Sequence, residues 1–431
     1  MTEVKKAIVV GSGAGGAAVA NELQGSFEVT VVEEGQEFKP FTRDLRASAR
    51  WKKSGLFFDE REISLLFPAM RILKTKEIVL VRGRGHGGTT TISTGNAVRQ
   101  DGALKRLGIN LDEEFEAIGR EIPISADHEK HWRPATKRLF EICRDLGLSP
   151  WPIPKMGDYA HCRHCGRCVL GCPAGVKWDS RQYLASATAS GARLMSGARV
   201  TRVLIQNGTA QALEIKLGLR KKTLPADLIV LAAGGLGTPL ILQRSGIPYE
   251  SRLFVDPVLC VAAVREGSDL DREIEMPFVV EQDGFIISPY FDLLSFFYNR
   301  RWSFPAGDIV SLMIKLADRP EGSISSRGVQ KVLYPEDRAR LEEGVALCRE
   351  ILSGLGIPKE RTFLGTINAG HPGGMLPLTE KESRSFHHSA LPGNLYVADA
   401  SLFPQSLGMP PILTIIAMAK RVGRVCRERF A

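Results

Sequence analysis

The chain has 431 residues, 44% of them hydrophobic and 24% charged, which fits a soluble globular protein of one large or two closely associated domains. Its formal charge of +9 is spread along the sequence without a nucleic-acid-binding motif, and its apolar runs are too short to span a bilayer. The first residues lead directly into a strand pattern and not a signal peptide, so we expect a cytoplasmic protein without a transmembrane segment.

The first predicted element is a buried strand that runs into a glycine turn, with the sequence KKAIVVGSGAGG over residues 5–16. A helix at 17–23 and a second strand at 29–32 follow. Gly11, Gly13 and Gly16 match G-x-G-x-x-G, in which glycines let a helix N-terminus approach a pyrophosphate. Glu33 lies about twenty residues further on, where a carboxylate can accept hydrogen bonds from a ribose. This order of elements predicts a doubly wound, dinucleotide-binding α/β fold.

Residues 41–76 are mixed in character, and we interpret them as a helical excursion. A strand is expected at 78–81, before a loop at 82–99 that is rich in glycine and hydroxyl side chains. So many small residues after a strand favour a backbone that lies against a planar or phosphorylated ligand. The candidates for ligand contact in this loop are Gly88, Thr89, Ser93 and Asn96.

Two expected helices, at 113–118 and 136–146, precede a compact cysteine segment. Its spacing is C-x2-C-x2-C-x3-C followed by proline, the pattern with which bacterial ferredoxins hold an iron–sulfur cluster. The four candidate ligands are Cys162, Cys165, Cys168 and Cys172. Zinc, with help from His161 or His164, is the main alternative. The cluster could be a 4Fe-4S or a 3Fe-4S species, bound by these four thiols or by three of them and a remote cysteine.

The remainder of the chain alternates between two kinds of pattern. A helix at 180–190, a hairpin at 200–217, a buried strand at 226–233 and a glycine turn continue the nucleotide fold, which closes with a strand at 394–398 and a helix at 411–427. Between them, short strands at 278–280, 284–288, 312–316 and 323–326 and a helix at 338–355 predict an inserted α+β domain with an antiparallel sheet. We therefore assign 1–105, 175–255 and 385–431 to a cofactor-binding domain built from discontinuous segments. Residues 106–174 and 256–384 are assigned to a substrate or cap domain, with an iron–sulfur segment expected at 160–175.

Several of these motifs together resemble the glucose–methanol–choline (GMC) family of flavin oxidoreductases. The matching stretches are 11–16 with Glu33, 87–99, 232–246, 371–374 and 394–415. The resemblance implies FAD as cofactor and alcohol oxidation as activity. It implies that Gly11, Gly13 and Gly16 hold the FAD pyrophosphate, that Glu33 holds the adenosine ribose, and that the backbone near Val200 meets the adenine. It also implies that Gly88, Asn96, Asp399 and Ser401 lie near the ribityl and isoalloxazine groups.

His371 resembles the family's active-site histidine. A neutral imidazole is a suitable base for the alcohol proton that must leave as hydride is transferred, whereas a structural histidine in a proline–glycine turn is the alternative. Asn368 could orient this histidine or the substrate. The family's second active-site residue, a histidine or asparagine, is replaced by Pro410, so its partner would be Asn368, His387 or His388, or would be absent.

The sequence therefore predicts an FAD-dependent dehydrogenase. Hydride would pass from an alcohol to flavin, and electrons would leave through the iron–sulfur cluster to a protein or quinone-like acceptor. Two alternatives stay open: a reductase that runs in the opposite direction on a carbonyl or C=C substrate, and a non-catalytic electron-transfer subunit, which Pro410 favours. Aromatic and aliphatic residues at 285–298 suggest an apolar substrate, although such residues are more often core.

Overall fold

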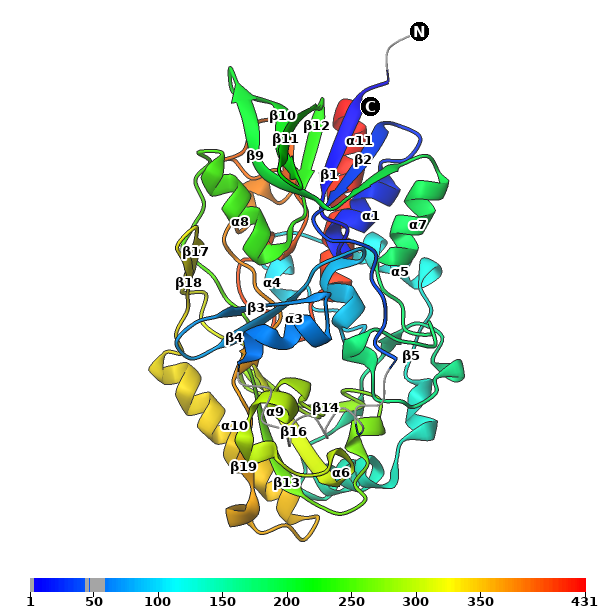
Figure 1. Ribbon diagram of the computed structural model, residues 1–431, viewed down its shortest axis with the longest axis vertical. Coiled ribbons are helices and arrows are strands. Elements are labelled where there is room, and N and C mark those ends of the chain that lie inside the picture. Colours follow the sequence, from blue (N-terminus) through cyan, green and yellow to red (C-terminus); the bar gives the residue numbers. More distant parts are fainter. Residues whose placement is uncertain (1–3, 43–45, 47–58) are drawn as a thin grey trace.

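The computed structural model describes residues 4–42, 46 and 59–431. Two layered units make up the molecule, one at either end of its long axis (Figure 1). One unit contains a parallel sheet with helices, and the other contains a larger, mostly antiparallel sheet. The chain passes between the units several times, so each is built from segments far apart in the sequence.

The parallel sheet has the strand order β21-β12-β1-β2-β8, with every neighbouring pair parallel. Its strands are β1 (Lys6–Val10), β2 (Glu28–Glu33), β8 (Arg193–Ser196), β12 (Leu228–Leu231) and β21 (Leu395–Val397). The central strands are nearly continuous runs of valine, isoleucine and leucine because both faces of the sheet are covered. In the sheet, β2 is the neighbour of β1 on one edge and β12 is its neighbour on the other, so the strand order reverses at β1. Such a reversal opens a crevice at the carboxyl end of β1.

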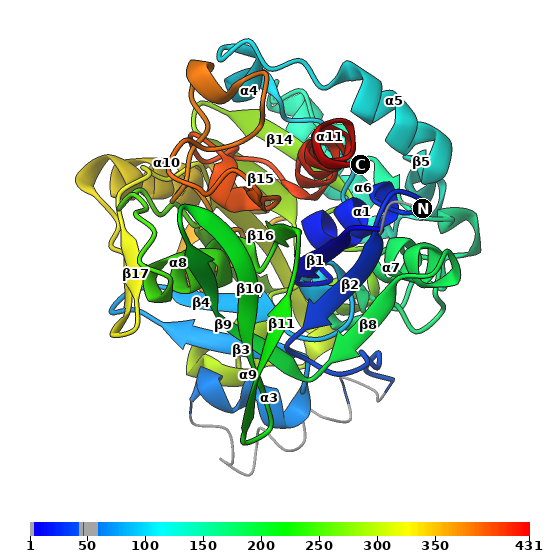
Figure 2. The same cartoon turned by 90° about the horizontal axis from the view of Figure 1, so that it is seen from above.

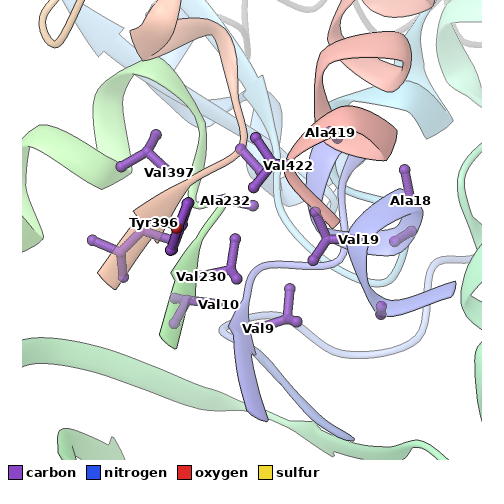
Figure 3. Close-up of a cluster of buried hydrophobic side chains, with 14 of the residues drawn as sticks. Val9, Val10, Ala18, Val19, Val230, Ala232, Tyr396, Val397, Ala419 and Val422 are labelled. Carbon is purple, nitrogen blue, oxygen red and sulfur yellow. The ribbon is translucent and has the colours of Figure 1, made fainter. Parts of the chain in front are cut away.

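Three helices cover one side of this sheet: α1 (Ala14–Glu22), α7 (Arg181–Ala189) and α11 (Ile412–Phe430) (Figure 2). Val19 of α1 and Ala419 and Val422 of α11 face Val9 and Val230 of the strands (Figure 3). The small residues of α1 allow it to pack closely against both the sheet and α11. Helix α5 (Asp112–Glu121) lies outside α11. The opposite side is covered by an antiparallel meander of β9 (Ala198–Gln206), β10 (Thr209–Leu217) and β11 (Arg220–Pro225), followed by α8 (Gly234–Arg244).

The second unit is a sheet of nine strands. In spatial order they are β3 (Met70–Lys74), β4 (Val79–Gly83), β20 (Asn368–Ala369), β13 (Val258–Val264), β16 (Ile309–Leu316), β15 (Phe285–Pro289), β14 (Phe278–Gln282) and β6 (Trp151–Pro152), with β19 (Phe363–Leu364) also paired to β13. Alternate residues of β13 enter two different cores. Leu259 and Val261 pack with α10 (Pro335–Ser353), and Cys260 packs with α9 (Leu293–Tyr298) on the opposite face.

Shorter elements connect these units. They are α3 (Ile63–Leu66), α4 (Gly102–Lys105), α6 (Pro134–Asp145), β5 (Ile124–Ser125), β7 (Lys155–Met156), β17 (Ser323–Ser325), β18 (Gly328–Gln330), and the single turns η2 (Gly88–Ile92) and η5 (Cys168–Leu170). In the described part of the chain, no helix is both long and apolar enough to cross a membrane.

The predicted fold class is confirmed: a doubly wound α/β unit accompanies an antiparallel sheet. Some elements were missed. The edge strand β8 and the strand β13 were not expected. The segment 41–76 contains β3 as well as helical turns, while its residues 43–45 and 47–58 lie outside the described residues. The domain boundaries remain a proposal. Strands β3 and β4 lie within the proposed segment 1–105 but pair into the second sheet, and α5 lies within 106–174 but packs on α11.

Candidate active site

A cavity of about 440 Å³ lies at the carboxyl ends of β1 and β12, between the two sheets. Its walls come from the glycine turn, the loop around η2, the start of β9 and α8 on one side, and from β13, β16 and the segment before α11 on the other. A volume of this size is in the usual range for a bound cofactor or small substrate. The cavity therefore lies where the topology predicts a ligand site.

The glycine turn forms one end of the cavity. Gly11 and Gly13 line it, whereas Gly16 lies behind them, where a Cβ atom would stand 2.0 Å from the Gly11 carbonyl oxygen. Glu33 is buried and lines the same end. Its carboxylate accepts hydrogen bonds from the Ser12 N–H (3.1 Å), the Ser12 hydroxyl (2.7 Å) and the Gly35 N–H (2.7 Å). Glu33 thus fixes the turn and leaves a carboxylate at the cavity wall.

The loop around η2 lies opposite the glycine turn, and all four of its predicted contact residues, Gly88, Thr89, Ser93 and Asn96, line the cavity. Two buried lysines hold this loop from behind. Lys177 Nζ donates to the carbonyl oxygens of Thr90 (2.9 Å), Thr91 (3.0 Å) and Ser93 (3.0 Å). Lys155 Nζ donates to Asn96 Oδ1 and to the Glu275 carbonyl, each at 2.5 Å. Neither lysine was identified from the sequence.

Only some of the remaining predicted cofactor-binding residues line the cavity. Val200 and Asp399 line the cavity, but Ser401 does not. Asp399 accepts hydrogen bonds from the Gly234 N–H (2.9 Å), the Thr238 hydroxyl (2.5 Å) and the Ser401 N–H (2.9 Å). Burial raises the pKa of Asp399, although these donors oppose the shift. Ser401 therefore stands behind Asp399 and positions it through its backbone.

His371 and Asn368 both line the cavity on the side of the larger sheet. Asn368 Nδ2 lies 3.5 Å from Asp292 Oδ2 and donates to the Thr366 carbonyl at 3.2 Å. Asp292 caps α9 and has a pKa raised to about 6, chiefly by burial. The predicted pair of site residues is thus brought together, with a carboxylate beside each member.

The carboxylate beside His371 belongs to Asp256, whose Oδ2 is 3.4 Å from His371 Nδ1. The same carboxylate oxygen is 2.5 Å from Lys315 Nζ, and both Asp256 and Lys315 have 1% of their side-chain surface exposed. Burial lowers the pKa of His371, and the Lys315 charge acts in the same direction while Asp256 opposes it. Pro410 also lines the cavity, at the position where the sequence lacks the expected polar side chain. His387 and His388 do not line it: His387 Nε2 is 3.0 Å from the Pro392 carbonyl oxygen instead.

The four cysteines of the segment 162–172 line a second, small cavity. The charged side chains among its described lining residues are Arg163, Arg167 and Lys177, with His164 beside them, and none is acidic. A cavity lined by these positive side chains suits a group that carries negative charge, such as a cluster bound by thiolates. Burial raises the pKa of Cys162 and Cys165, and raises that of Cys168 to about 12, so binding a metal would release protons. Among the described residues, no three histidine, cysteine, aspartate or glutamate side chains surround one point closely enough to hold a single metal ion.

The two cavities are neighbours. Cys168 lines the small one, and the next residue, Val169, lines the large one. Lys177 lines the small cavity while its ammonium group holds the η2 loop of the large cavity. The cysteine segment is therefore packed directly behind the loop that the sequence assigns to cofactor contact.

A crevice at the carboxyl end of a doubly wound sheet, closed by a second sheet with a histidine just after one of its strands, is the arrangement of an α/β protein that binds a nucleotide cofactor. The sequence pattern of the GMC oxidoreductase family matches residues 5–261, more than half of the chain, so the protein belongs to that family, whose members bind FAD. The resemblance drawn from the motifs is thereby confirmed as to family.

The chain is also similar to several individual proteins. The chain is 28% identical to an uncharacterised protein of Methanocaldococcus jannaschii, over 96% of this chain and 98% of the other. It is 30% identical to an uncharacterised GMC-type oxidoreductase of Mycobacterium tuberculosis (96% and 75%), and 23% identical to a long-chain-alcohol oxidase of Arabidopsis thaliana (98% and 67%). The crystal structure of pyridoxine 4-oxidase from Mesorbium loti has the same fold, with a TM-score of 0.73 over the whole of both chains at 18% identity.

Proposed function

We propose that the protein is an FAD-dependent dehydrogenase that oxidises an alcohol, and that electrons leave through an iron–sulfur cluster to an external acceptor. The observation that carries the proposal is the arrangement of four thiols around a small cavity one residue away from the cavity lined by the glycine turn and His371. A one-electron carrier at that place favours a dehydrogenase over an oxidase. Relatives described as oxidases make this distinction the one to test.

The residues of the large cavity fit FAD. Gly13 presents its backbone to the cavity without a side chain, opposite Gly88, and the buried carboxylate of Glu33 stands at the end of β2 where a ribose would be recognised. The η2 loop, held by Lys177 and Lys155, offers a rigid backbone surface for the ring system. A bound flavin would supply the hydride acceptor.

His371 would take the alcohol proton. Its Nδ1 is buried on the side of Asp256, which leaves Nε2 as the nitrogen that can meet a substrate in the cavity. Because burial and Lys315 lower its pKa, the ring is neutral and able to accept a proton near pH 7. Asn368 lies on the same wall and would hold the substrate oxygen.

The cysteine segment would hold the one-electron carrier. The four thiols share one cavity, the charged side chains among its described lining residues are positive, and Cys168 is buried, as are Lys155 and Lys177. The test begins with protein purified without oxygen. Stoichiometric iron and acid-labile sulfide, FAD released by heat, and an EPR signal on reduction are the expected results. Stoichiometric zinc without sulfide would refute the electron exit.

The direction of the reaction is tested separately. Primary alcohols from ethanol to dodecan-1-ol, benzyl alcohol and pyridoxine are mixed with the oxidised protein, and flavin absorbance is followed. In the Cys168→Ala variant, alcohol should still bleach the flavin while reduction of an external one-electron acceptor, ferricenium, is lost. Cys143→Ala, which changes another buried thiol outside the segment, is the matched control and should keep both activities. Failure of every alcohol to bleach the flavin would favour a reductase or a non-catalytic subunit.

A further inference from the structure

We propose that Asp256 and Lys315 are positioning residues that fix His371, and that together they replace the polar side chain missing at Pro410. The inference rests on the proposed function, because it assigns a role to two residues around its base. Four facts carry it: the contacts of Asp256, the burial of the pair, the support beneath it, and the place of Lys315 in the cavity wall.

Asp256 is the central residue. Its Oδ2 atom lies between two cations or potential cations, 2.5 Å from Lys315 Nζ and 3.4 Å from His371 Nδ1, while its Oδ1 atom accepts from the Ser406 hydroxyl. His371 Nδ1 is buried without a well-aligned hydrogen bond among the described residues. A small rotation of the ring would complete an Nδ1–H···Oδ2 hydrogen bond, and catalytic contacts often tighten in this way when a ligand binds. Asp256 is thus placed to select one tautomer of the ring.

Lys315 supplies the balancing charge. It lies on β16, whose other residues are buried and mostly apolar, and its side chain lines the cavity. Besides Asp256, its ammonium group donates to the Met409 carbonyl at 3.3 Å, directly before Pro410. A buried lysine in an apolar strand is costly unless it is paired. Its contacts therefore link the base, through Asp256, to the segment in which the second family residue is missing.

A second buried pair holds Asp256 in place. Asp318 accepts hydrogen bonds from the N–H groups of Val255 (3.1 Å) and Asp256 (2.7 Å), and Lys331 Nζ is 2.7 Å from Asp318. The backbone at Asp256 has φ of +53°, a conformation that costs energy for a residue with a side chain. Two buried ion pairs, Asp256 with Lys315 and Asp318 with Lys331, hold this strained backbone in place. The protein thus keeps an unfavourable local conformation that fixes the position of the Asp256 carboxylate.

The chemical role follows from the charges. An aspartate alone beside the ring would favour the imidazolium, which cannot accept a proton, whereas a lysine alone would leave the tautomer unspecified. The pair does both: Asp256 accepts from Nδ1–H, and Lys315 cancels most of its charge, so that Nε2 is the free acceptor. Asp292, beside Asn368, is another carboxyl group in the cavity wall. The other titratable or charged side chains that line the cavity are Glu33, Glu34, Arg82, Arg84, Arg199, Arg244, Tyr290 and Asp399.

The test compares Asp256→Asn, Lys315→Met and the double variant. Asparagine tolerates the positive φ and keeps the shape of Asp256 while removing its charge. Two measurements are made: the titration of the His371 ring by NMR of protein with isotope-labelled histidine, and the rate of flavin reduction by benzyl alcohol or dodecan-1-ol across pH. The NMR measurement requires no substrate, so it separates failure of this inference from failure of the proposed function.

Lys315→Met should raise the pKa of His371, Asp256→Asn should lower it and mix the tautomers, and the double variant should return toward wild type. Asp256→Asn should slow flavin reduction roughly 10- to 1,000-fold with a smaller change in KM. Lys420→Met is the control, because Lys420 is another buried lysine, paired with Glu22 and Glu121, and none of these three residues lines the cavity. It should lower stability without moving the His371 titration. Unchanged titration and tautomer in folded Lys315→Met protein would overturn the inference, even if Asp256→Asn fails to fold.

Discussion

Substitution of Gly15 by alanine tests the packing that places the nucleotide site. Gly15 is buried in the first turn of α1, and a Cβ atom built there would stand 1.6 Å from the carbonyl oxygen of Ala398, where real contacts do not fall below 3.0 Å. In an open helix, glycine to alanine is stabilising by about 0.5–1 kcal/mol. At Gly15 the helix would have to move roughly 1.5 Å from β21 in a close-packed core, and overpacking of this kind costs about 1–3 kcal/mol or more.

We therefore expect Gly15→Ala to lower the free energy of unfolding by at least about 2 kcal/mol. FAD affinity should fall about tenfold or more, because Ala398 precedes Asp399 and Gly15 lies within the glycine turn. Urea unfolding of the apoprotein followed by circular dichroism measures the first effect, and quenching of flavin fluorescence measures the second.

Gly119→Ala is the matched control. Gly119 lies in helix α5 and is exposed, and a Cβ atom built there meets no atom within 4 Å. This variant should gain about 0.5–1 kcal/mol of stability and bind FAD as the wild type does. If Gly15→Ala were as stable as wild type, the close approach of α1 and β21 would be wrong, and with it the placement of Asp399 beside the glycine turn.

Three further predictions follow from buried polar groups. Glu33→Gln keeps one acceptor but loses the charged hydrogen bonds to the turn. The FAD dissociation constant, measured by isothermal titration calorimetry, should therefore rise about tenfold. An unchanged constant would show that Glu33 does not contact the ribose. Lys177→Met leaves three carbonyls of the η2 loop without their donor, so we expect a loss of about 2–4 kcal/mol and faster hydrogen exchange over 88–96; unchanged protection there would show that the loop is held otherwise. His128 is buried, accepts from Trp132 Nε1 at Nδ1 and contacts the Ile153 carbonyl through Nε2, and burial lowers its pKa from 6.5 to about 4. As the pH falls, the unfolded chain protonates this histidine before the folded protein does. The contribution of His128 to the free energy of unfolding should therefore be fully present above pH 6.5 and fall by about 3 kcal/mol toward pH 4. Urea titrations of His128→Gln should lack this pH-dependent component.

The sequence predicted those parts of the molecule that depend on local pattern. The strand, glycine turn and helix at 6–22 and the buried strand at 228–231 follow from periodicity and small residues, and the structure contains them with shifts of a few residues at their ends. Gly11, Gly13, Glu33, His371 and Asn368 line one cavity, as their motifs imply. The cysteine ligands and the domain boundaries stay predictions.

The sequence did not reveal contacts that depend on distant segments. Lys315 lies 59 residues from Asp256 in the chain, and only the pairing of β13 with β16 brings them together. A lysine inside an otherwise apolar strand at 309–316 was the signal that could have identified it. The role of Gly15 was hidden for a different reason: it occupies a variable position of the glycine motif, and the atom that excludes a side chain belongs to residue 398.

The order of strands in the parallel sheet also sets the order in which the protein can fold during synthesis. Strand β1 and helix α1 leave the ribosome early, yet their neighbours are β12, which begins at Leu228, and α11, which begins at Ile412. At about 5–20 residues per second, roughly 20 to 80 s pass between completion of β1 and completion of β21. During that interval the apolar faces of the first strand and helix lack their final cover, and Asp399 does not yet exist. The nascent chain thus exposes apolar surface for this interval, and a cofactor site that includes Asp399 can form only after residue 399 has been added.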